Sequence, residues 1–402
     1  MRVLAIGCGG VGTAAALIAK RRDFFEAWFV ADYDLARATA LRDRLDDPRF
    51  EAAKVDASSI DAVAQLCRMN DITHVVNFVD PRFVMSIFQG ALVAQANYLD
   101  TAMSLSAPHP DSPHSLTGVK LGDAQFDLSE KFANRGLVAL CGMGVEPGLS
   151  DVFARYAADH LFDSIDQIGV RDGADLEVAG HAFAPTFSIW TMIEECLNPP
   201  VVWERERGWF TTEPFSGAEE FTFPEGIGTL TCVNVEHEEV LLIPRWIDCN
   251  EVTFKYGLGD KFIDVLSTLH ELGLDSVTPV SVKGTMVSPR DVVAAVLPDP
   301  LTLGDKMSGR TCAGTWVTGT KDGKPRDVYL YHVTDNEWSM REYGAQAVVW
   351  QTAMNPVIAL ELLASGTWSG RGVVGPEAFD AVPYLDLMRD GYGQAFGIQE
   401  RT

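Results

Sequence analysis

The first twelve residues constrain the fold more than any other part of the chain. An apolar strand over residues 2–6 runs into a turn in which Gly7, Gly9 and Gly12 form the pattern G-x-G-x-x-G, and a helical run over residues 13–21 follows at once. Such a strand–turn–helix unit is typical of sites that hold the pyrophosphate of a dinucleotide against the N-terminus of a helix. We therefore expect this turn to bind a dinucleotide cofactor through Gly7, Gly9, Gly10, Val11 and Gly12.

The second predicted strand ends on an acidic residue. Residues 28–31 form an apolar run that stops at Asp32, about 20 residues after Gly12. A carboxylate at this place accepts a hydrogen bond from the ribose 2′-OH and repels the 2′-phosphate of NADP. The sequence therefore favours NAD over NADP. The alternative is that the glycine-rich turn only joins a strand to a helix. That alternative does not explain why an acidic residue, Asp32, follows Gly12 at the spacing of a dinucleotide site.

The first third of the chain alternates between short apolar strands and helical segments. Helical patterns over residues 35–45, 60–69 and 81–96 separate strands near 50–55 and 73–78. Strands separated by helical patterns predict a parallel sheet, whose ligands bind at the carboxyl ends of the strands. This geometry is expected to gather further residues around one crevice, namely Asp56, Asn77 and Phe78 at the cofactor and Asp100 at its rim.

From Asp163 the pattern changes to longer strands rich in β-branched and aromatic residues. They lie near residues 167–171, 221–223, 229–235, 252–255, 315–320 and 328–333, and a turn over 320–324 joins the last two as a hairpin. These strands predict a second α+β domain that is mainly antiparallel. We expect an α/β chain whose dinucleotide-binding domain covers residues 1–145 and is completed by 346–402, with the second domain over 146–345.

Composition excludes several classes of partner. The chain of 402 residues has a formal net charge of −24, which argues against binding nucleic acid or an anionic membrane. No uninterrupted apolar stretch approaches the roughly 18 residues that span a bilayer. The strand that begins at Arg2 leaves no room for a signal peptide, so we expect a cytoplasmic protein. The 7 cysteines show no zinc spacing, so no metal site is expected.

Several stretches, in order along nearly the whole chain, carry a family resemblance. They are residues 97–102, 144–148, 180–184, 212–214, 237–239, 297–300, 319–324, 344–347, 366–368 and 372–377. With these stretches the chain resembles the saccharopine dehydrogenase-like oxidoreductases, and among them the carboxynorspermidine dehydrogenase and saccharopine reductase branch. Lysine 6-dehydrogenases share the early turns and residues 212–214, but they fit less well at residues 237–239.

The resemblance implies a fold and a reaction class. It implies a Rossmann domain that includes the C-terminal segment, a central α+β domain for substrate binding and dimerisation, and a homodimer. It also implies NAD(P)-linked chemistry at a CH–NH bond of a small amine, an amino acid or a polyamine derivative. Oxidative deamination of lysine and a catalytically silent NAD-binding regulator are the alternatives. Residues 186–190 and 351–356 depart from the polyamine enzymes and leave the substrate open.

Chemistry at a CH–NH bond needs groups that move a proton near the nitrogen, so histidines and carboxylates are the natural candidates. Asp100 follows a predicted strand end, where it binds an ammonium, relays a proton or only caps the next segment. His181 lies in a stretch that the resemblance places over the active site. His237-Glu238-Glu239 reads as an alternating strand with His237 and Glu239 on one face. The catalytic candidates are therefore Asp100, His181 and Glu239, with a solvated edge strand as the alternative for the last.

Substrate contacts are expected from a second glycine-rich turn and from the central domain. Gly144 lies in the turn over residues 142–148, and Arg245 is suited to a substrate carboxylate or, equally, to a structural salt bridge. Phe187, like Trp190, would form an apolar wall, although aromatic residues more often belong to the core. Cys141 is expected to be inert packing. The predicted substrate-binding residues are Asp100, Gly144, His181, Phe187, Ser188 and Arg245.

Overall fold

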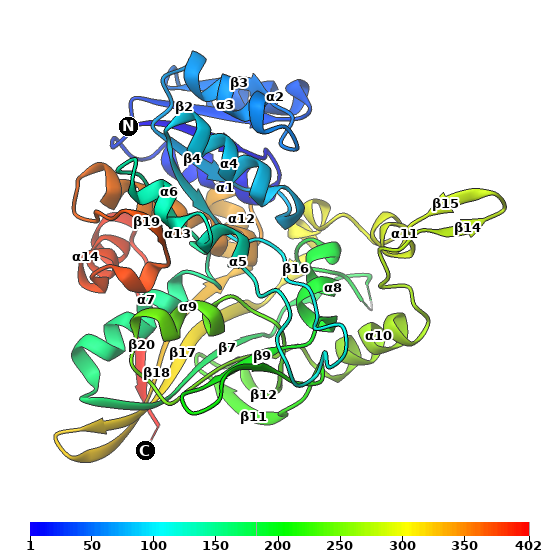
Figure 1. The fold of residues 1–402 in the computed structure, drawn as a ribbon, viewed down its shortest axis with the longest axis vertical. Coiled ribbons are helices and arrows are strands. Elements are labelled where there is room, and N and C mark those ends of the chain that lie inside the picture. Colours follow the sequence, from blue (N-terminus) through cyan, green and yellow to red (C-terminus); the bar gives the residue numbers. More distant parts are fainter. Residues whose placement is uncertain (182, 402) are drawn as a thin grey trace.

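The fold consists of two sheets joined by helices, in a computed structural model that describes residues 1–181 and 183–401. Figure 1 shows the N-terminal sheet with its helices at the top and the second sheet below, with α7 (Leu149–Tyr156) and α9 (Glu239–Trp246) between them. A hairpin arm projects from one side of the second sheet. The predicted α/β class with a parallel and a mainly antiparallel domain is confirmed.

The first sheet is parallel and has the strand order β3-β2-β1-β4-β5-β6-β19. Strand interiors are almost wholly apolar because helices cover the sheet, as burial on both faces requires. The strands are β1 Arg2–Ile6, β2 Ala27–Asp32, β3 Phe50–Lys54, β4 His74–Asn77, β5 Asn97–Asp100, β6 Val138–Leu140 and β19 Gly372–Val374. Asp32, Asn77 and Asp100 therefore end parallel strands at the same edge of this sheet, Asn77 and Asp100 on the adjacent strands β4 and β5 and Asp32 on β2, across β1.

The helices of this domain include one from the far C-terminal part of the chain. They are α1 Gly10–Ala19, α2 Leu35–Leu45, α3 Ile60–Met69, α4 Val84–Ala94, α5 Asp123–Phe126, α6 Ser129–Ala133 and α13 Ala347–Ala364, with a 3₁₀ turn η1 at Pro81–Phe83. Among the described residues, α13 is long and apolar enough to cross a membrane, but 72% of it is buried in the protein. It packs along α1, so it is a core helix.

The second sheet is mainly antiparallel, with β10-β9-β13-β7-β17-β18-β20 in order and β11–β12 attached to β13. Only β13 and β7 among its described neighbours run parallel. Its strands are β7 Ser164–Ala174, β9 Val201–Glu204, β10 Gly208–Thr211, β11 Glu219–Phe223, β12 Gly228–Asn234, β13 Glu251–Gly257, β17 Arg310–Lys321, β18 Lys324–Asp335 and β20 Gly397–Glu400. Asp322 and Gly323 both have positive φ at the predicted hairpin turn.

The C-terminal segment is shared between the two sheets. β19 pairs with β6 in the parallel sheet, whereas β20 pairs with β18 in the second sheet. The last strand therefore departs from the expected assignment of residues 346–402 to the first domain. A strand pairs where an edge is open, and β18 offers one beside the chain's end.

Further helices surround the second sheet and carry the arm. They are α8 Ile189–Leu197, α10 Asp260–Glu271, α11 Pro289–Val296 and α12 Asn336–Tyr343. A further helix, α14 Ala381–Asp386, instead packs against α7 and α13. The arm is the hairpin of β14 Val280–Val282 and β15 Thr285–Val287, which extends beyond α11 (Figure 1). A small antiparallel pair, β8 Glu177–Val178 and β16 Met307–Ser308, lies apart from the main sheets.

Candidate active site

The glycine-rich turn after β1 has the geometry that a dinucleotide requires. Gly7 has a φ of +109°, and a Cβ at Gly12 would lie 1.9 Å from the Gly7 carbonyl oxygen, so the turn and its packing against α1 demand glycine. A Cβ at Gly9 would meet nothing within 4 Å. The open space at Gly9 is where the backbone can approach a pyrophosphate. These residues fit a dinucleotide cofactor.

A cavity of about 230 Å³ lies beside this turn. Cys8 and Gly9 line one side, and Tyr343, Gln346 and Val349 from the C-terminal half line the other. The cavity therefore lies between the glycine-rich turn and the N-terminal end of α13. Its two sides come from parts of the chain more than 300 residues apart in sequence. The Arg21 side chain also joins these parts, because it donates to the carbonyl oxygen of Glu342, 321 residues further along.

Asp32 supports the glycine-rich turn directly. The backbone N–H of Cys8 donates to its Oδ2 (2.9 Å), and the N–H of Asp34 donates to its Oδ1 (2.9 Å). The neighbouring Tyr33 is 72% exposed. Each carboxylate oxygen has a second lone pair, so Asp32 can hold the turn and still accept a hydrogen bond from a ribose hydroxyl.

The other predicted cofactor residues lie along the same edge of the sheet. Asp56 follows β3, is exposed, and accepts hydrogen bonds from the N–H and Oγ of Ser58, which lower the pKa of its carboxyl group. Asn77 is buried and donates to the Tyr98 hydroxyl (3.3 Å), while the Phe78 N–H donates to the Ile6 carbonyl oxygen (2.9 Å). Their contact with a cofactor stays a prediction.

Asp100 is fully buried and holds the second glycine-rich turn. The N–H of Gly142 donates to its Oδ1 (2.7 Å) and the Gln125 side chain donates to its Oδ2 (2.8 Å). Burial raises the pKa of Asp100 to about 7, against the lowering effect of these two hydrogen bonds. The Gln125 amide also contacts Cys141 Sγ (3.1 Å), and burial raises the pKa of that thiol well above its ordinary value. These contacts favour a positioning role for Asp100 and packing for Cys141.

Residues 237–239 do not form the predicted strand. β12 ends at Asn234, His237 lies in the connection, and Glu239 begins α9. The stretch Val240–Ile243 that follows is completely buried, which favours a helix packed on its apolar residues over an exposed edge strand. Because the backbone turns there, Glu238 is not directed away from the other two side chains as the alternating pattern predicted.

His237, Glu238 and Glu239 instead form one buried cluster. The His237 Nδ1 lies 2.6 Å from Glu239 Oε2 and 3.4 Å from Glu238 Oε2. The imidazole stacks on Phe254, with ring centroids 3.8 Å apart. Burial lowers the pKa of His237, but the two carboxylates outweigh it and raise that pKa to about 10. The imidazole is therefore protonated at neutral pH.

This cluster is anchored at the carboxyl ends of the parallel strands. The backbone N–H of Met103, just after β5, donates to Glu238 Oε1 (3.0 Å). The Ser150 hydroxyl, in the first turn of α7 after β6, donates to Glu239 Oε1 (2.9 Å). The cluster therefore lies at the edge of the sheet where ligands of such folds generally bind.

The same cluster brings one possible metal-ligand atom from each residue within 4.8 Å of one another. The His237–Glu239 hydrogen bond and the two anchors above already use most of these atoms. The three side chains are thus held in a hydrogen-bonded network. That the site binds no metal stays a prediction.

Sequence reasoning missed four further carboxyl groups near this cluster: Glu146, Asp172, Glu195 and Glu236. Burial raises the pKa of Glu195 to about 8 and that of Glu236 to about 7. Glu236 Oε2 accepts hydrogen bonds from Ser106 (2.8 Å) and Asn198 (3.0 Å). Glu146 lies two residues after Gly144 in the turn over residues 142–148, and this position was the one available indication of its role. Asp172 lies on β7 and Glu195 on α8, whereas Glu236 lies in the connection between β12 and α9, directly before His237.

A second cavity, of about 200 Å³, lies against the second sheet. Asp172 and Tyr256 form its polar side, and Phe187 and Phe262 contribute aromatic walls. Val348 in the first turn of α13 closes it toward the first domain. The Gln346 amide of the cofactor-side cavity donates to the Thr186 carbonyl oxygen (2.5 Å), so the start of α13 separates the two cavities.

The structure does not gather all predicted substrate residues at this cavity. Phe187 lines it, whereas Ser188 caps α8 by accepting from the Thr191 N–H (3.3 Å). His181 is exposed and donates its N–H to the Val178 carbonyl oxygen; its neighbour Ala182 lies outside the described residues. Arg245 lies over the Phe126 ring (3.8 Å), a packing contact that gives no support to carboxylate binding.

Gly144 keeps the second glycine-rich turn compact. Its N–H donates to the Pro147 carbonyl oxygen (2.6 Å), and an added Cβ would lie 3.2 Å from Thr352 Cγ2 on α13. Gly144 thus lies close to α13, the helix that closes the second cavity. Its contact with a substrate stays a prediction.

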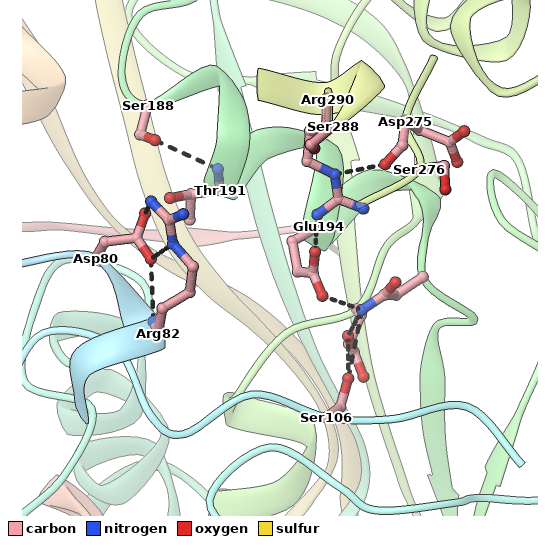
Figure 2. A network of polar contacts seen from close by, with 12 residues as sticks. Asp80, Arg82, Ser106, Ser188, Thr191, Glu194, Asp275, Ser276, Ser288 and Arg290 are labelled. Atoms are coloured by element: carbon pink, nitrogen blue, oxygen red, sulfur yellow. Dashed lines mark hydrogen bonds and ion pairs between the residues drawn. The ribbon is translucent and has the colours of Figure 1, made fainter. Parts of the chain in front are cut away.

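Figure 2 shows polar contacts where the two domains meet. Arg82 of the first domain pairs with Asp80, and Arg290 pairs with Glu194 (Figure 2). Both guanidinium groups also lie over the Trp190 ring, Arg82 at 4.4 Å and Arg290 at 4.7 Å. Trp190 thus contacts two guanidinium groups, one from each domain, and fixes α8 against the first domain.

Comparison with known proteins agrees with this architecture. The family model described as the saccharopine dehydrogenase NADP binding domain matches residues 3–140, and the saccharopine dehydrogenase C-terminal domain matches residues 144–393. A carboxynorspermidine synthase from Vibrio alginolyticus is 32% identical over 100% of this chain and 97% of its own length. A carboxyaminopropylagmatine dehydrogenase from Synechocystis is 26% identical over 96% of this chain and 94% of its own length.

A solved structure shows the same fold at low identity. The apo saccharopine dehydrogenase (L-Glu forming) from Saccharomyces cerevisiae superposes with a TM-score of 0.71 and covers 100% of both chains, at 14% identity.

Proposed function

This chain belongs to the saccharopine dehydrogenase family, and we propose that it joins a primary amine to an amino-acid semialdehyde by NAD(P)-dependent reduction, or runs the reverse reaction. It is an NAD(P)-dependent oxidoreductase of CH–NH bonds, like the relatives that match it from end to end. The observation that carries the proposed reaction is the buried cluster of His237, Glu238 and Glu239 at the carboxyl ends of the parallel strands.

The cluster is suited to the proton transfers of this chemistry. When the amine adds to the aldehyde and water leaves, one proton must reach the departing oxygen, and the resulting C=N bond is then reduced to the secondary amine. Protonated His237 can donate this proton from Nε2, because Nδ1 is hydrogen-bonded to Glu239. Glu239 holds the orientation of the ring and stabilises its charge. A bound nicotinamide cofactor supplies the hydride for the reduction or accepts it in reverse.

Electrostatics favour an amine substrate. Glu195, Glu236, Glu238 and Glu239 surround the site, and His237 is the sole basic side chain that forms an ion pair with any of them in the described part of the chain. An excess of buried carboxyl groups is unfavourable unless they are protonated or a cation arrives. A substrate ammonium group supplies that cation.

NAD is the preferred cofactor in this proposal. Asp32 lies at the end of β2, with Oδ2 bonded to the glycine-rich turn and Oδ1 bonded to the N–H of Asp34. Its negative charge repels a 2′-phosphate, whereas a free 2′-OH can donate to it.

The proposal also includes a cytoplasmic homodimer. The predicted partner is a second copy of the chain, and the exposed apolar side chains of the β14–β15 arm support it, with Val280 at 49%, Val282 at 52% and Met286 at 63% exposure. A two-stranded hairpin is marginal when solvated on all sides, so contact with another surface would stabilise it.

The decisive experiment follows nicotinamide absorbance with purified protein in both directions. Diamines are paired with amino-acid semialdehydes in the presence of NADH or NADPH, and lysine, saccharopine and carboxynorspermidine are tested with NAD and NADP. We expect turnover with an amine plus a semialdehyde, and near loss of it in Glu239→Gln. Release of ammonia from lysine without coupling would favour the lysine 6-dehydrogenase alternative. Tight NADH binding without turnover of any amine would favour the silent regulator.

A further inference from the structure

A buried side-chain oxygen beside the cofactor-side cavity accepts no hydrogen bond. Gln346 directly precedes α13, lines this cavity and is only 4% exposed. Its Oε1 atom is buried, and no donor in the described part of the chain lies within hydrogen-bond distance of it. A buried carbonyl oxygen without a donor is unfavourable, and such atoms are rare in folded proteins. This oxygen is therefore suited to accept a hydrogen bond from a bound ligand.

The other end of the same amide group fixes its orientation. Gln346 Nε2 donates to the carbonyl oxygens of Thr186 (2.5 Å) and Pro300 (3.3 Å). Both partners can only accept, so the NH₂ group of the amide must face them. Exchanging the two amide atoms would place Oε1 against two carbonyl oxygens. Because the NH₂ group is held in this way, Oε1 cannot turn toward these backbone groups to find a partner.

Gln346 lies between the two cavities and is bonded to the lining of each. Pro300 and Val349 line the cofactor-side cavity, whereas Thr186 and Val348 line the second cavity. Nε2 therefore binds one carbonyl group from each lining, and the first turn of α13 presents one valine to each cavity. A ligand that bonds Oε1 is connected through a single amide group to the wall of the second cavity.

The chemistry of Oε1 and its place in the fold select the part of the cofactor that it meets. A carbonyl oxygen carries only lone pairs, so it repels phosphate oxygens and needs an O–H or N–H donor. Ribose hydroxyl groups are such donors, and the proposed function gives the ribose of the adenosine half to Asp32. The second cavity adjoins the reacting cluster, because Tyr256 lines it and lies edge-on to the His237 ring, with centroids 5.9 Å apart. Gln346, which borders that cavity, therefore lies on the nicotinamide side.

We propose that Gln346 Oε1 accepts a hydrogen bond from a hydroxyl group of the ribose next to the nicotinamide, and so positions the reacting end of the cofactor against the second cavity. The second half of this inference rests on the proposed function, which brings the amine to the His237 cluster. Gln346 is a positioning residue. Its Nε2 fixes the Thr186 carbonyl group, directly before the Phe187 wall, while its Oε1 holds the ribose. The cofactor is thus held by the glycine-rich turn and by the C-terminal half of the chain.

The test compares the binding of ADP, which ends at the pyrophosphate, with that of ADP-ribose, which adds the second ribose. Calorimetry measures both affinities for the wild type and for Gln346→Met, whose side chain has a similar length but no amide group. We expect the variant to bind ADP-ribose about 3- to 10-fold more weakly, the range for one hydrogen bond, and to bind ADP with unchanged affinity. NADH, followed by its fluorescence, should show the same loss as ADP-ribose.

Gln351→Met is the matched control for this replacement. Gln351 is buried on the same helix, and its Nε2 also donates to a backbone carbonyl oxygen, that of His332 (3.1 Å), but its side chain lines neither of the two cavities. The control variant should keep the ratio of the two affinities even where its thermal midpoint falls. A ratio that falls equally in both variants would show a general effect of loosening α13 and would overturn the inference.

The remaining outcomes of the binding test also decide the inference. Unchanged affinity for both ligands in Gln346→Met would overturn it, since that result is expected when Oε1 bonds only an ordered water molecule. Equal weakening of ADP and ADP-ribose would also overturn it, because the damage would then lie at the glycine-rich turn. A loss confined to NADH would place the contact on the nicotinamide ring and not on the ribose.

These measurements need no turnover, so they separate the inference from the proposed reaction. Weakened binding of ADP-ribose in a protein that turns over no amine would support the ribose contact while the proposed reaction fails. Amine turnover together with unchanged ADP-ribose binding in Gln346→Met would overturn the contact and leave the reaction intact. Where amines are turned over, the variant should also raise the KM of the amine, because the Thr186 carbonyl group beside Phe187 loses its donor.

Discussion

At the scale of single residues, Asp32 combines a structural and a selective role. Its oxygens accept from the N–H groups of Cys8 and Asp34, so it shapes the glycine-rich turn, and its charge decides which ribose fits beside it. Replacing it by serine keeps a hydroxyl acceptor but removes the charge. Adding arginine at the exposed neighbouring position 33 then offers a partner for a 2′-phosphate.

We expect the double variant Asp32→Ser/Tyr33→Arg to shift the ratio of kcat/KM for NAD over NADP by about 10- to 100-fold toward NADP. NAD loses the charged hydrogen bond from its ribose 2′-OH to the carboxylate, and the 2′-phosphate of NADP gains one from the new arginine. Steady-state kinetics with both cofactors provide the measurement. Asp34→Ser is the matched control, since serine can still cap α2 and the same charge is removed two positions away. An unchanged ratio in the double variant would refute the placement of Asp32.

The His237–Glu239 pair makes a second prediction at this scale. Glu239→Gln removes the charge that holds the imidazole protonated and oriented, so we expect kcat to fall by about 10²- to 10³-fold with a smaller change in the KM of the amine. Because the pKa of His237 should fall toward its ordinary value, the loss should be greater at pH 8 than at pH 6. A pH–rate profile measures this. A uniform loss at all pH values would indicate a merely structural role for Glu239.

At the scale of elements, two glycines of the same turn should behave differently. A Cβ at Gly12 collides with the Gly7 carbonyl oxygen at 1.9 Å, whereas a Cβ at Gly9 meets nothing within 4 Å. Gly12→Ala should therefore displace α1 from β1, lowering the stability of the free protein by about 1–3 kcal/mol and weakening NADH binding. Gly9→Ala should weaken NADH binding while leaving the thermal midpoint of the free protein unchanged. Calorimetric unfolding with and without NADH distinguishes the two, and equal midpoints for both variants would contradict the assignment.

The elements that sequence predicted best are those with a strong local pattern. The turn at Asp322 and Gly323 is fixed by residues that tolerate positive φ, and the strand before Gly7 is fixed by its apolar run and the glycines after it. The stretch 237–239 was predicted wrongly because three polar residues carry no periodicity of their own. The buried run Val240–Ile243 decides their structure by starting α9, a tertiary effect that alternation does not reveal.

The site itself was only partly predictable for a related reason. Glu239 was a catalytic candidate, and His237 was singled out in the same stretch, because the two are close in sequence and chemically distinctive. Glu146, Asp172 and Glu195 reach the same region from a turn, a strand and a helix, and one sequence contains no information on which of these segments meet. In the parallel sheet, the carboxyl ends of the strands lie at one edge, so residues distant in sequence can be predicted to meet there. The antiparallel second domain offers no equivalent rule.

At the scale of the whole molecule, the acidic interior should make stability depend on pH. Burial raises the pKa of several carboxyl groups from near 4 in an unfolded chain to about 7 for Asp100, Glu236 and Glu377 and to about 8 for Glu195. A raised pKa in the folded state stabilises the fold fully below the unfolded value, and this stabilisation is lost as the pH rises through the folded value.

We therefore expect the thermal midpoint of the free protein to fall as the pH rises from about 5 to 8, the reverse of a protein whose carboxylates are paired in salt bridges. Differential scanning calorimetry at constant ionic strength measures this. Glu195→Gln should flatten the slope, and the exposed carboxylate variant Glu177→Gln should not. A midpoint that rises over this range would show that the buried carboxyl groups are ionised and paired in the folded protein.

The association of two copies depends on the projecting arm. Met286 is 63% exposed and Val280 is 49% exposed on a hairpin that extends away from both sheets (Figure 1), and charged side chains there would be solvated in a monomer but buried in a dimer. Val280→Lys/Met286→Lys should therefore convert a particle of about twice 43.9 kDa into one of 43.9 kDa, with the far-ultraviolet circular dichroism spectrum unchanged. Analytical ultracentrifugation gives both masses, and Met69→Lys, at a residue 71% exposed at the end of α3, is the matched control.

A wild-type monomer would refute the homodimer, while a variant that remains dimeric would place the interface on another surface. If the arm completes the dimer, the variant should keep NADH binding, because the glycine-rich turn lies in the other domain.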